Sequence, residues 1–248
     1  MNLTKILRET YENVPGETIL PIKVAGKDVL GNITEVYEQF LNPDERKKIY
    51  DNTHHSNSIY HPLVASTVLL NQVFQKSPWE TQDIDTFLFS LLAFQNEKSF
   101  YLTGAFISAL VNIHHKHTNQ KDYILPLEQL DKPLDYICSK NDGANILVKG
   151  NCGEAFASDM ISGNVICEGS VGANIGMKLK SGIILIKKDA VGWIGRDMID
   201  GCITIKGRIH GHTEEDIKPI SSDSFYEIHV ENSFGGEIYH GSRRVFPK

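Results

Sequence analysis

Residues 145–211 read NILVKGNCGEAFASDMISG, NVICEGSVGANIGMKLKSG, IILIKKDAVGWIGRDMIDG and CITIKGRIHG. These pieces start at residues 145, 164, 183 and 202, so the chain can be cut every 19 residues. Each full unit ends in Ser-Gly or Asp-Gly. Three full units and the start of a fourth therefore form a repeat, and this repeat decides the architecture of the second half of the chain.

Apolar residues occupy the even-numbered positions within each unit. The second, fourth and eighth positions hold Ile146, Val165, Ile184 and Ile203, then Val148, Cys167, Ile186 and Ile205, then Cys152, Val171, Ala190 and Ile209. Odd-numbered positions include the charged residues Lys149, Glu168, Lys187 and Lys206. Alternation with a period of two places one set inside and the other in water, which is typical of strands and not of helices.

The odd length of the unit requires one corner that absorbs the extra residue. The closing glycines Gly163, Gly182 and Gly201 can provide it, because glycine accepts the positive φ that such a corner needs. Equivalent residues then stack about 4.8 Å apart, and the units coil into a parallel β-helix. A leucine-rich repeat has a similar period, but the leucine pattern and asparagine ladder that it needs are absent.

The glycines inside the units carry a family resemblance. These glycines are Gly169, Gly172, Gly176, Gly192 and Gly195. Together with Met177 and Met198, they resemble the GXGXG-motif domain. That domain occurs in the large chain of glutamate synthase and in one of the chains of formylmethanofuran dehydrogenase. The resemblance covers about residues 143–211. It implies a right-handed β-helix with a structural role, either a wedge between catalytic domains or a subunit beside those that carry pterin and metal chemistry. No recognisable amidotransferase or flavin domain accompanies it.

The first half of the chain has a different composition and is predicted to be helical. Asn42 is expected to cap a helix that begins at Pro43, and Ser77 with Glu80 is expected to form a capping box. Apolar residues at helical spacing predict three core helices of a small bundle, over residues 63–74, 84–92 and 102–113.

Two domains are therefore predicted, a mainly helical domain at 1–135 and a β-helix with C-terminal capping strands at 136–248. The fold class is α+β. Residues 118–144 contain prolines, acids and an Asn-Asp-Gly cluster, which suits a connector. Solenoid ends need covers, and we expect the helical half to cover one end and the strand-like segments FYEIHV (225–230) and EIYHG (237–241) to cover the other.

The charge and hydropathy of the chain limit the classes of partner. The 25 Lys and Arg residues are outnumbered by 31 Asp and Glu residues, giving a net charge of -6, so we expect no nucleic-acid partner. The longest apolar stretches are shorter than the roughly 20 residues that span a bilayer, so no membrane span is predicted. The charged first residues MNLTKILRETYENV do not resemble a signal peptide, and we expect a cytoplasmic protein.

Glycines and cysteines raise two cofactor hypotheses, neither of which we adopt. The segment GSVGANIG could offer backbone N–H groups to a phosphate, but the spacing is that of no nucleotide-binding loop, and repeat corners explain the glycines. The four cysteines lack the close pairing of a zinc or iron–sulfur site. Cys152 and Cys167 fall on inward positions and are interpreted as small core residues. We predict no cofactor.

Four histidines are weak candidates for metal ligands. His114 and His117 lie three residues apart, where a helix would place them on one face, although cations at a helix C-terminus are the simpler interpretation. His210 and His212 lie two apart before an acidic run, which also fits a solvated exit loop.

These features favour a noncatalytic scaffold or docking subunit of a larger complex, of the oxidoreductase type as the resemblance implies. Trp193, at an outward position of the third unit, is a candidate partner contact. Two alternatives stay open. One is a small enzyme or metal-binding protein with a site between the helical half and the β-helix. The other is a homo-oligomer with no further partner.

Overall fold

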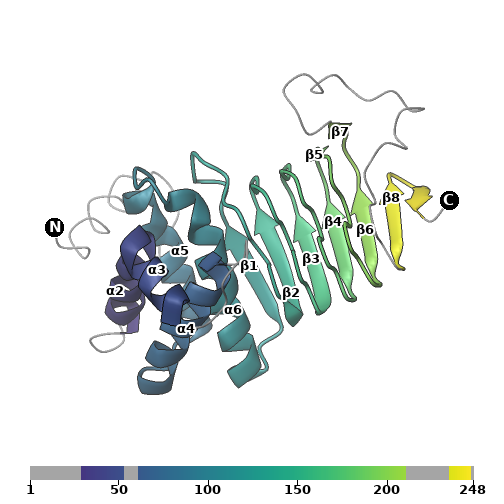
Figure 1. Cartoon of the computed structure of the whole chain (residues 1–248). Coiled ribbons are helices and arrows are strands. Elements are labelled where there is room, and N and C mark those ends of the chain that lie inside the picture. Colours follow the sequence, from purple (N-terminus) through teal and green to yellow (C-terminus); the bar gives the residue numbers. More distant parts are fainter. Residues whose placement is uncertain (1–28, 53–60, 211–234, 247–248) are drawn as a thin grey trace, which may run out of the picture.

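The computed structural model describes residues 29–52, 61–210 and 235–246. Figure 1 shows a helical bundle at one end of an elongated β-solenoid, with successive strands laid side by side. The solenoid has about five turns that follow one another at about 19 residues. This α+β arrangement confirms the predicted fold class.

The helices lie where apolar residues recur at helical spacing. The three predicted core helices are confirmed, although the stripes at 84–92 and 102–113 extend into neighbouring 3₁₀ turns. The α-helices are α2 (Val29–Leu41), α3 (Pro43–Asn52), α4 (His61–Lys76), α5 (Thr81–Ser90) and α6 (Thr103–Thr118), with 3₁₀ turns η1 (Leu91–Phe94) and η2 (Phe100–Leu102).

One predicted helix cap is confirmed and the other is wrong. Asn42 Oδ1 accepts hydrogen bonds from the backbone N–H groups of Asp44 at 2.9 Å and Glu45 at 3.4 Å. The capping box of α5 does not begin at Ser77. Glu80 is the N-cap, and its backbone N–H donates to Asp83 Oδ2 at 2.8 Å. The helix therefore starts later, because an acid three residues after Glu80 satisfies its free N–H.

Tyr37 lies at the centre of the helical core. Its ring centroid is 5.1 Å from those of Phe87, Phe94 and Phe106, and its hydroxyl bonds Thr103 Oγ1 at 2.6 Å. A fully buried hydroxyl needs such a partner. This cluster joins α2, α5, η1 and α6 into one bundle.

Two sheets and a series of single bridges form the solenoid. The larger sheet has the order β1-β2-β3-β4-β6-β8-β9, and the smaller pairs β5 with β7. The strands are β1 (Asp122–Pro126), β2 (Asp142–Lys149), β3 (Ser162–Cys167), β4 (Ile183–Ile186), β5 (Ala190–Val191), β6 (Cys202–Ile205), β7 (Ile209–His210), β8 (Glu237–His240) and β9 (Arg243–Phe246).

The register follows the repeat in the sequence. Val165 pairs with Ile184, which pairs with Ile203, each one unit further along the chain. On a second wall, Cys152 pairs with Val171 and Val171 with Ala190. The 19-residue period is therefore the length of one coil, as predicted.

The solenoid begins one coil before the repeat. Strand β1 pairs in parallel with β2, and Leu134 bridges Cys152 of the next coil. The interpretation of residues 118–144 as a connector is therefore wrong. This coil was missed because the spacing from Tyr123 to its partner Ile146 is longer than the unit, so the period does not extend to it.

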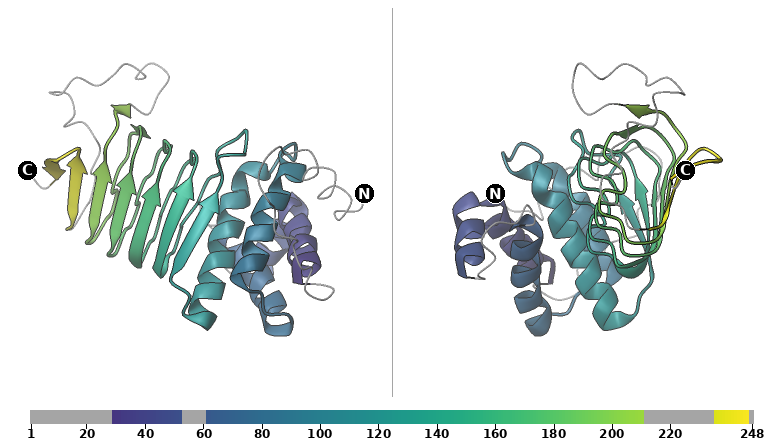
Figure 2. Two further views of the ribbon diagram at one scale, coloured as in Figure 1. Left: turned by 180° about the vertical axis from the view of Figure 1, so that it is seen from behind. Right: turned by 45° about the vertical axis from the view of Figure 1, so that its right-hand side comes forward.

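Both described ends of the solenoid carry covers. Helix α6 lies against the first coil, where Ser108 Oγ donates to Tyr136 O at 2.7 Å and Asn112 Nδ2 to Ser139 O at 3.0 Å. At the other end, β8 continues the parallel sheet and β9 turns back antiparallel to it. Figure 2 shows the bundle and the β8–β9 hairpin at opposite ends. The other predicted capping segment, residues 225–230, lies outside the described residues.

The helical bundle and the solenoid share one hydrophobic core. Buried apolar residues form a continuous cluster from Ile33 in α2 to Ile238 in β8. Among the described helices, none is both long enough and apolar enough to cross a membrane.

Candidate functional site

The outer face of the larger sheet carries an apolar row. Ile146 and Val148 point into the core, so Leu147 between them points outward. The strand register aligns the equivalent residues of neighbouring coils, and this outer row consists of Ile124, Leu147, Ile166 and Leu185, continued by Thr204 and Tyr239. Four strands thus carry a single line of large aliphatic side chains on the outer face, of which Ile124 is exposed and the other three are half-buried.

Polar residues border the outer row along one side from β2 to β6 and along the first three strands of the other. Lys149, Glu168, Lys187 and Lys206 stack along one side, where Lys187 Nζ lies 2.7 Å from Glu168 Oε1. Along the other side, Asn145 Nδ2 donates to Asp122 Oδ1 at 2.9 Å, and Asn164 Nδ2 donates to Asn145 Oδ1 at 2.8 Å. An apolar strip with a polar rim is the usual anatomy of a protein-binding surface.

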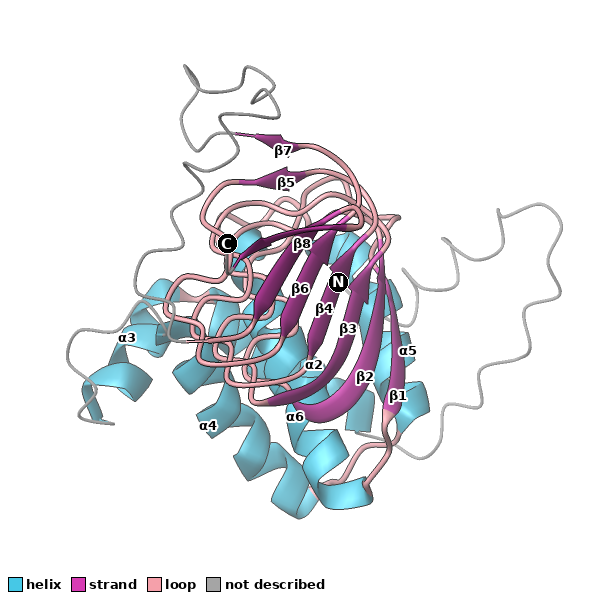
Figure 3. Cartoon of the chain, turned by 90° about the vertical axis from the view of Figure 1, so that its right-hand side faces the viewer, coloured by secondary structure: helices cyan, strands magenta, loops and turns pink. Residues whose placement is uncertain are grey.

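No described element covers this face. Figure 1 shows the strands β1 to β8 turned to the viewer with the helices beside them, and Figure 3 shows the same sheet forming one side of the solenoid. The side chains of Ile124 and of Ile183, which borders the row, are 53% and 51% exposed, whereas Ile184 is fully buried. Leu147, Ile166 and Leu185 are half-buried, so the face is partly accessible in the described part of the chain.

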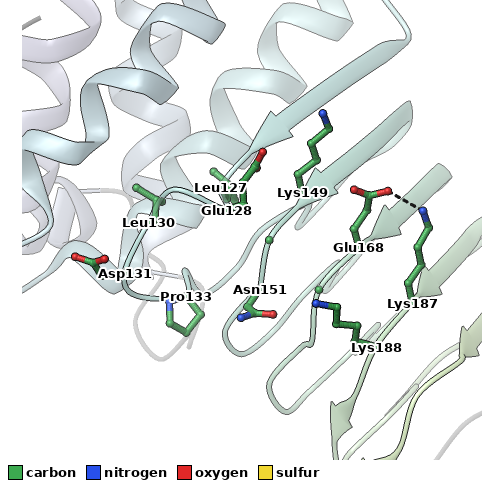
Figure 4. Close-up of a pocket in the computed structure, with 12 residues that line it drawn as sticks. Leu127, Glu128, Leu130, Asp131, Pro133, Lys149, Asn151, Glu168, Lys187 and Lys188 are labelled. Carbon is green, nitrogen blue, oxygen red and sulfur yellow. Dashed lines mark hydrogen bonds and ion pairs between the residues drawn. The ribbon is translucent and has the colours of Figure 1, made fainter. Parts of the chain in front are cut away.

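A groove of about 590 Å³ lies at one edge of the same sheet. Figure 4 shows its lining, with Glu128 and Asp131 on the loop after β1, and lysines contributed by successive coils. The lining residues are Leu127, Glu128, Leu130, Asp131, Pro133, Lys149, Gly150, Asn151, Glu168, Gly169, Lys187 and Lys188. Acids and lysines are balanced in number there, so the groove suits polar contacts at the rim of the outer face.

Asp135 is the carboxyl group at the junction of the two halves. Its backbone N–H donates to Tyr101 O at 2.8 Å, and its Oδ1 accepts from the Glu154 N–H at 2.8 Å. Burial raises the pKa of Asp135 to about 6. The hydrogen bond from the Glu154 N–H acts in the opposite direction, and the negative charge of Glu154 adds to the effect of burial. The side chain links the first coil to the second, so its bonding fits a structural role.

Backbone conformation accounts for one group of the predicted corner glycines. Gly163, Gly182 and Gly201 have φ between 98° and 102°, and Gly176 and Gly195 have φ of 59° and 67°. These values lie in the region that glycine alone adopts freely.

Limited space accounts for a second group of glycines. A Cβ on Gly169 would lie 2.1 Å from Gly150 O, and one on Gly172 would lie 2.8 Å from Gly153 C. Gly192 is buried and donates its N–H to His210 O at 2.8 Å. The geometry at these positions is that of stacked coils.

Trp193 lies at a coil corner and not on the outer face. It is half-buried with φ 56°, and the Arg196 guanidinium lies 5.9 Å from its ring centroid. Equivalent residues of other coils share the left-handed conformation, among them Tyr136, Ala155 and Asn174. The outer row and Trp193 are therefore separate surfaces.

The histidine candidates have individual partners within the described chain. His114 Nδ1 bonds the Tyr123 hydroxyl at 2.8 Å, and burial lowers the pKa of His114. His117 stacks on Phe74 with centroids 4.7 Å apart, and His210 Nε2 lies 3.2 Å from Asp189 Oδ2. His212 lies outside the described residues. Within the ranges that the structure describes, no group of three or more His, Cys, Asp or Glu could hold a metal ion.

The outer row was missed by sequence reasoning although a signal was present. The third position of each unit holds Leu147, Ile166 and Leu185, which stand between two inward apolar residues and so complete an unbroken apolar run. Such a run indicates a strand that is apolar on both faces. The charged residue at the fifth position of each unit indicated a solvated outer face, so the apolar third position was not recognised as part of a surface row.

Comparison with protein-family models, curated proteins and solved structures gives no match to this chain. The resemblance to the GXGXG-motif domain thus stays a prediction from the glycine pattern.

Proposed function

We propose that this protein is a noncatalytic β-solenoid scaffold whose outer sheet face docks another protein subunit. The observation that carries the proposal is the outer row, in which the exposed Ile124 and the half-buried Leu147, Ile166 and Leu185 lie in line on the outer face of the sheet. The GXGXG-like glycine pattern suggests an oxidoreductase-type complex as the assembly. In such a complex the chain would position a catalytic subunit and perform no chemistry itself.

The geometry supports docking for a physical reason. Leu147, Ile166 and Leu185 lie on adjacent strands about 4.8 Å apart, so a partner can cover all of them at once. Burial of apolar surface contributes roughly 25 cal/mol per Å² before the costs of association. The charged row and the asparagine row on either side would then specify orientation more than affinity.

The test uses the tagged full chain in its own cells, with native mass spectrometry of the purified assembly. Ile166→Lys places a charge at the centre of the outer row. Its control is Ile199→Lys, the same substitution at a 52% exposed isoleucine outside the larger sheet. A central contact is worth about 2 kcal/mol, so we expect roughly 30-fold weaker association for Ile166→Lys and unchanged association for the control.

Three results would overturn the proposal: no partner protein in the spectrum, equal loss with both variants, or full retention with Ile166→Lys. Circular dichroism of both variants checks that each is folded. A stoichiometric metal on a lone chain would favour the metal-binding alternative, and a mass of several identical chains would favour the homo-oligomer.

A further inference from the structure

Two cysteines from adjacent coils meet inside the solenoid. Cys152 lies in the bridge to Val171, and Cys167 ends β3. Their Sγ atoms are 3.9 Å apart, and both side chains are buried, with 4% and 0% exposure. Sulfur atoms at this distance are in direct contact across the stacked coils.

The two sulfur atoms have different surroundings. The Cys167 thiol donates to Gly150 O at 3.5 Å, and its sulfur is within hydrogen-bond distance of the Cys152 sulfur. That hydrogen bond lowers the pKa of Cys167, whereas burial raises the pKa of Cys152 well above its ordinary value. Cys167 is therefore the more acidic of the two thiols, and the Cys152 sulfur lies in contact with it.

We propose that Cys152 and Cys167 form a disulfide when the chain meets a hydroperoxide. The Cys167 thiol gives up its proton and its sulfur attacks the terminal oxygen. The O–O bond breaks, a sulfenic acid forms, and the leaving hydroxide or alkoxide takes up that proton to become water or an alcohol. The Cys152 sulfur then attacks the Cys167 sulfur, the S–O bond breaks, and the hydroxyl leaves as water with the Cys152 proton. The two thiols lose two electrons and the peroxide gains them.

The structural change is small. A disulfide needs an S–S distance of about 2.05 Å, so the sulfur atoms approach by roughly 2 Å through side-chain rotation. The product would join the coil of β2 to the coil of β3 and close a loop of 15 residues in the unfolded chain. A cross-link of this kind limits the opening of one coil from the next, which would make the scaffold more resistant to unfolding under oxidising conditions.

The experiment treats the folded full chain with dilute hydrogen peroxide, alkylates the remaining thiols after denaturation, and maps the peptides by mass spectrometry. We expect a dithiothreitol-sensitive peptide pair that contains Cys152 and Cys167, and a Tm increase of roughly 6 to 12 °C. Cys202→Ser is the matched control, because Cys202 is half-buried and lies on a different strand, β6. That variant should keep both the cross-link and the Tm increase.

Cys167→Ser should lose both. If Cys167→Ser proves unstable, the peptide map of the unaltered chain decides the proposal alone. Recovery of both cysteines as alkylated thiols would overturn it, and so would a cross-link to Cys138 or terminal oxidation of Cys167 without a cross-link.

Discussion

Replacement of Gly182 by alanine tests the stacking of the coil corners. Gly182 has φ 102°, and a Cβ there would lie 2.5 Å from Gly163 O and 2.7 Å from Met160 Cε. An alanine held in this backbone region costs about 1 to 3 kcal/mol, and an overlap in a packed interior costs a similar amount. The lower entropy of the unfolded chain offsets about 0.4 to 1 kcal/mol. We expect Gly182→Ala to lower the free energy of unfolding by about 2 to 4 kcal/mol.

The matched control is Gly241→Ala in the turn between β8 and β9. Gly241 also has a positive φ, 60°, but a Cβ there would have no atom within 4 Å. This left-handed conformation costs an alanine about 1 kcal/mol. The lower conformational entropy of the unfolded chain offsets much of that cost, so we expect a small change in the free energy of unfolding.

The assay is urea denaturation of both variants and the unaltered chain, followed by circular dichroism. Gly163 contributes the carbonyl oxygen that the new methyl group would meet, so the larger effect at Gly182 includes the overlap between stacked coils as well as its backbone conformation. If Gly182→Ala were no less stable than Gly241→Ala, the reasoning about the corners would be refuted.

Three further predictions concern the core, a helix cap and the junction. Ile184→Ala removes a fully buried side chain and should lower the free energy of unfolding by about 2 to 5 kcal/mol, whereas Ile183→Ala, at 51% exposure, should lower it by less than about 1 kcal/mol; urea denaturation measures both. Asn42→Ala removes the acceptor for two backbone N–H groups of α3 and should cost about 1 kcal/mol in the same assay. The pKa of the Asp135 carboxyl is raised to about 6 in the folded chain, so protonation of this group stabilises the folded state. This contribution to the free energy of unfolding is fully present below about pH 4 and is lost as the pH rises through 6. Relative to Asp135→Asn, the free energy of unfolding of the unaltered chain should therefore fall by about 1 to 2 kcal/mol between about pH 4 and pH 7, a value reduced for partial solvent screening.

Each of these predictions has a result that would contradict it. Equal losses for Ile184→Ala and Ile183→Ala would show that the two faces of β4 are not distinguished by burial. If Asn42→Ala had the same free energy of unfolding as the unaltered chain, Asn42 would not stabilise α3 as an N-cap. A constant difference between the unaltered chain and Asp135→Asn across the pH range would mean that the Asp135 carboxyl does not titrate there.

Much of the fold follows from local patterns. The period of 19 residues predicted the coil, because parallel stacking requires equal lengths between equivalent positions, and the pairing of Val165 with Ile184 has that spacing. The spacing of apolar residues likewise predicted the helices that became α4, α5 and α6. The cap at Ser77 failed because Asp83 favours a start at Glu80.

The outer row could be inferred only in part. The outward residues Leu147 and Ile166 are visible in the sequence as members of an apolar run, yet a run alone does not say which side chains another layer of the protein will cover. A helix above this sheet would have made the outer row part of the core. In the described part of the chain, the helical bundle lies at the end of the solenoid and not over this sheet (Figure 2).

The sequence by itself determined the repeat, its period, its inward residues and the helical character of the first half, because these depend on local periodicity. Only the tertiary structure decided that β1 starts the solenoid by pairing with β2, and that β8 continues it by pairing with β6. In both pairs, the partners lie more than one 19-residue unit apart in the sequence. It also brought Cys152 against Cys167. A contact between different positions of two adjacent coils depends on the path of each coil around the core. Spacing along the chain does not specify which side chains then meet inside the solenoid.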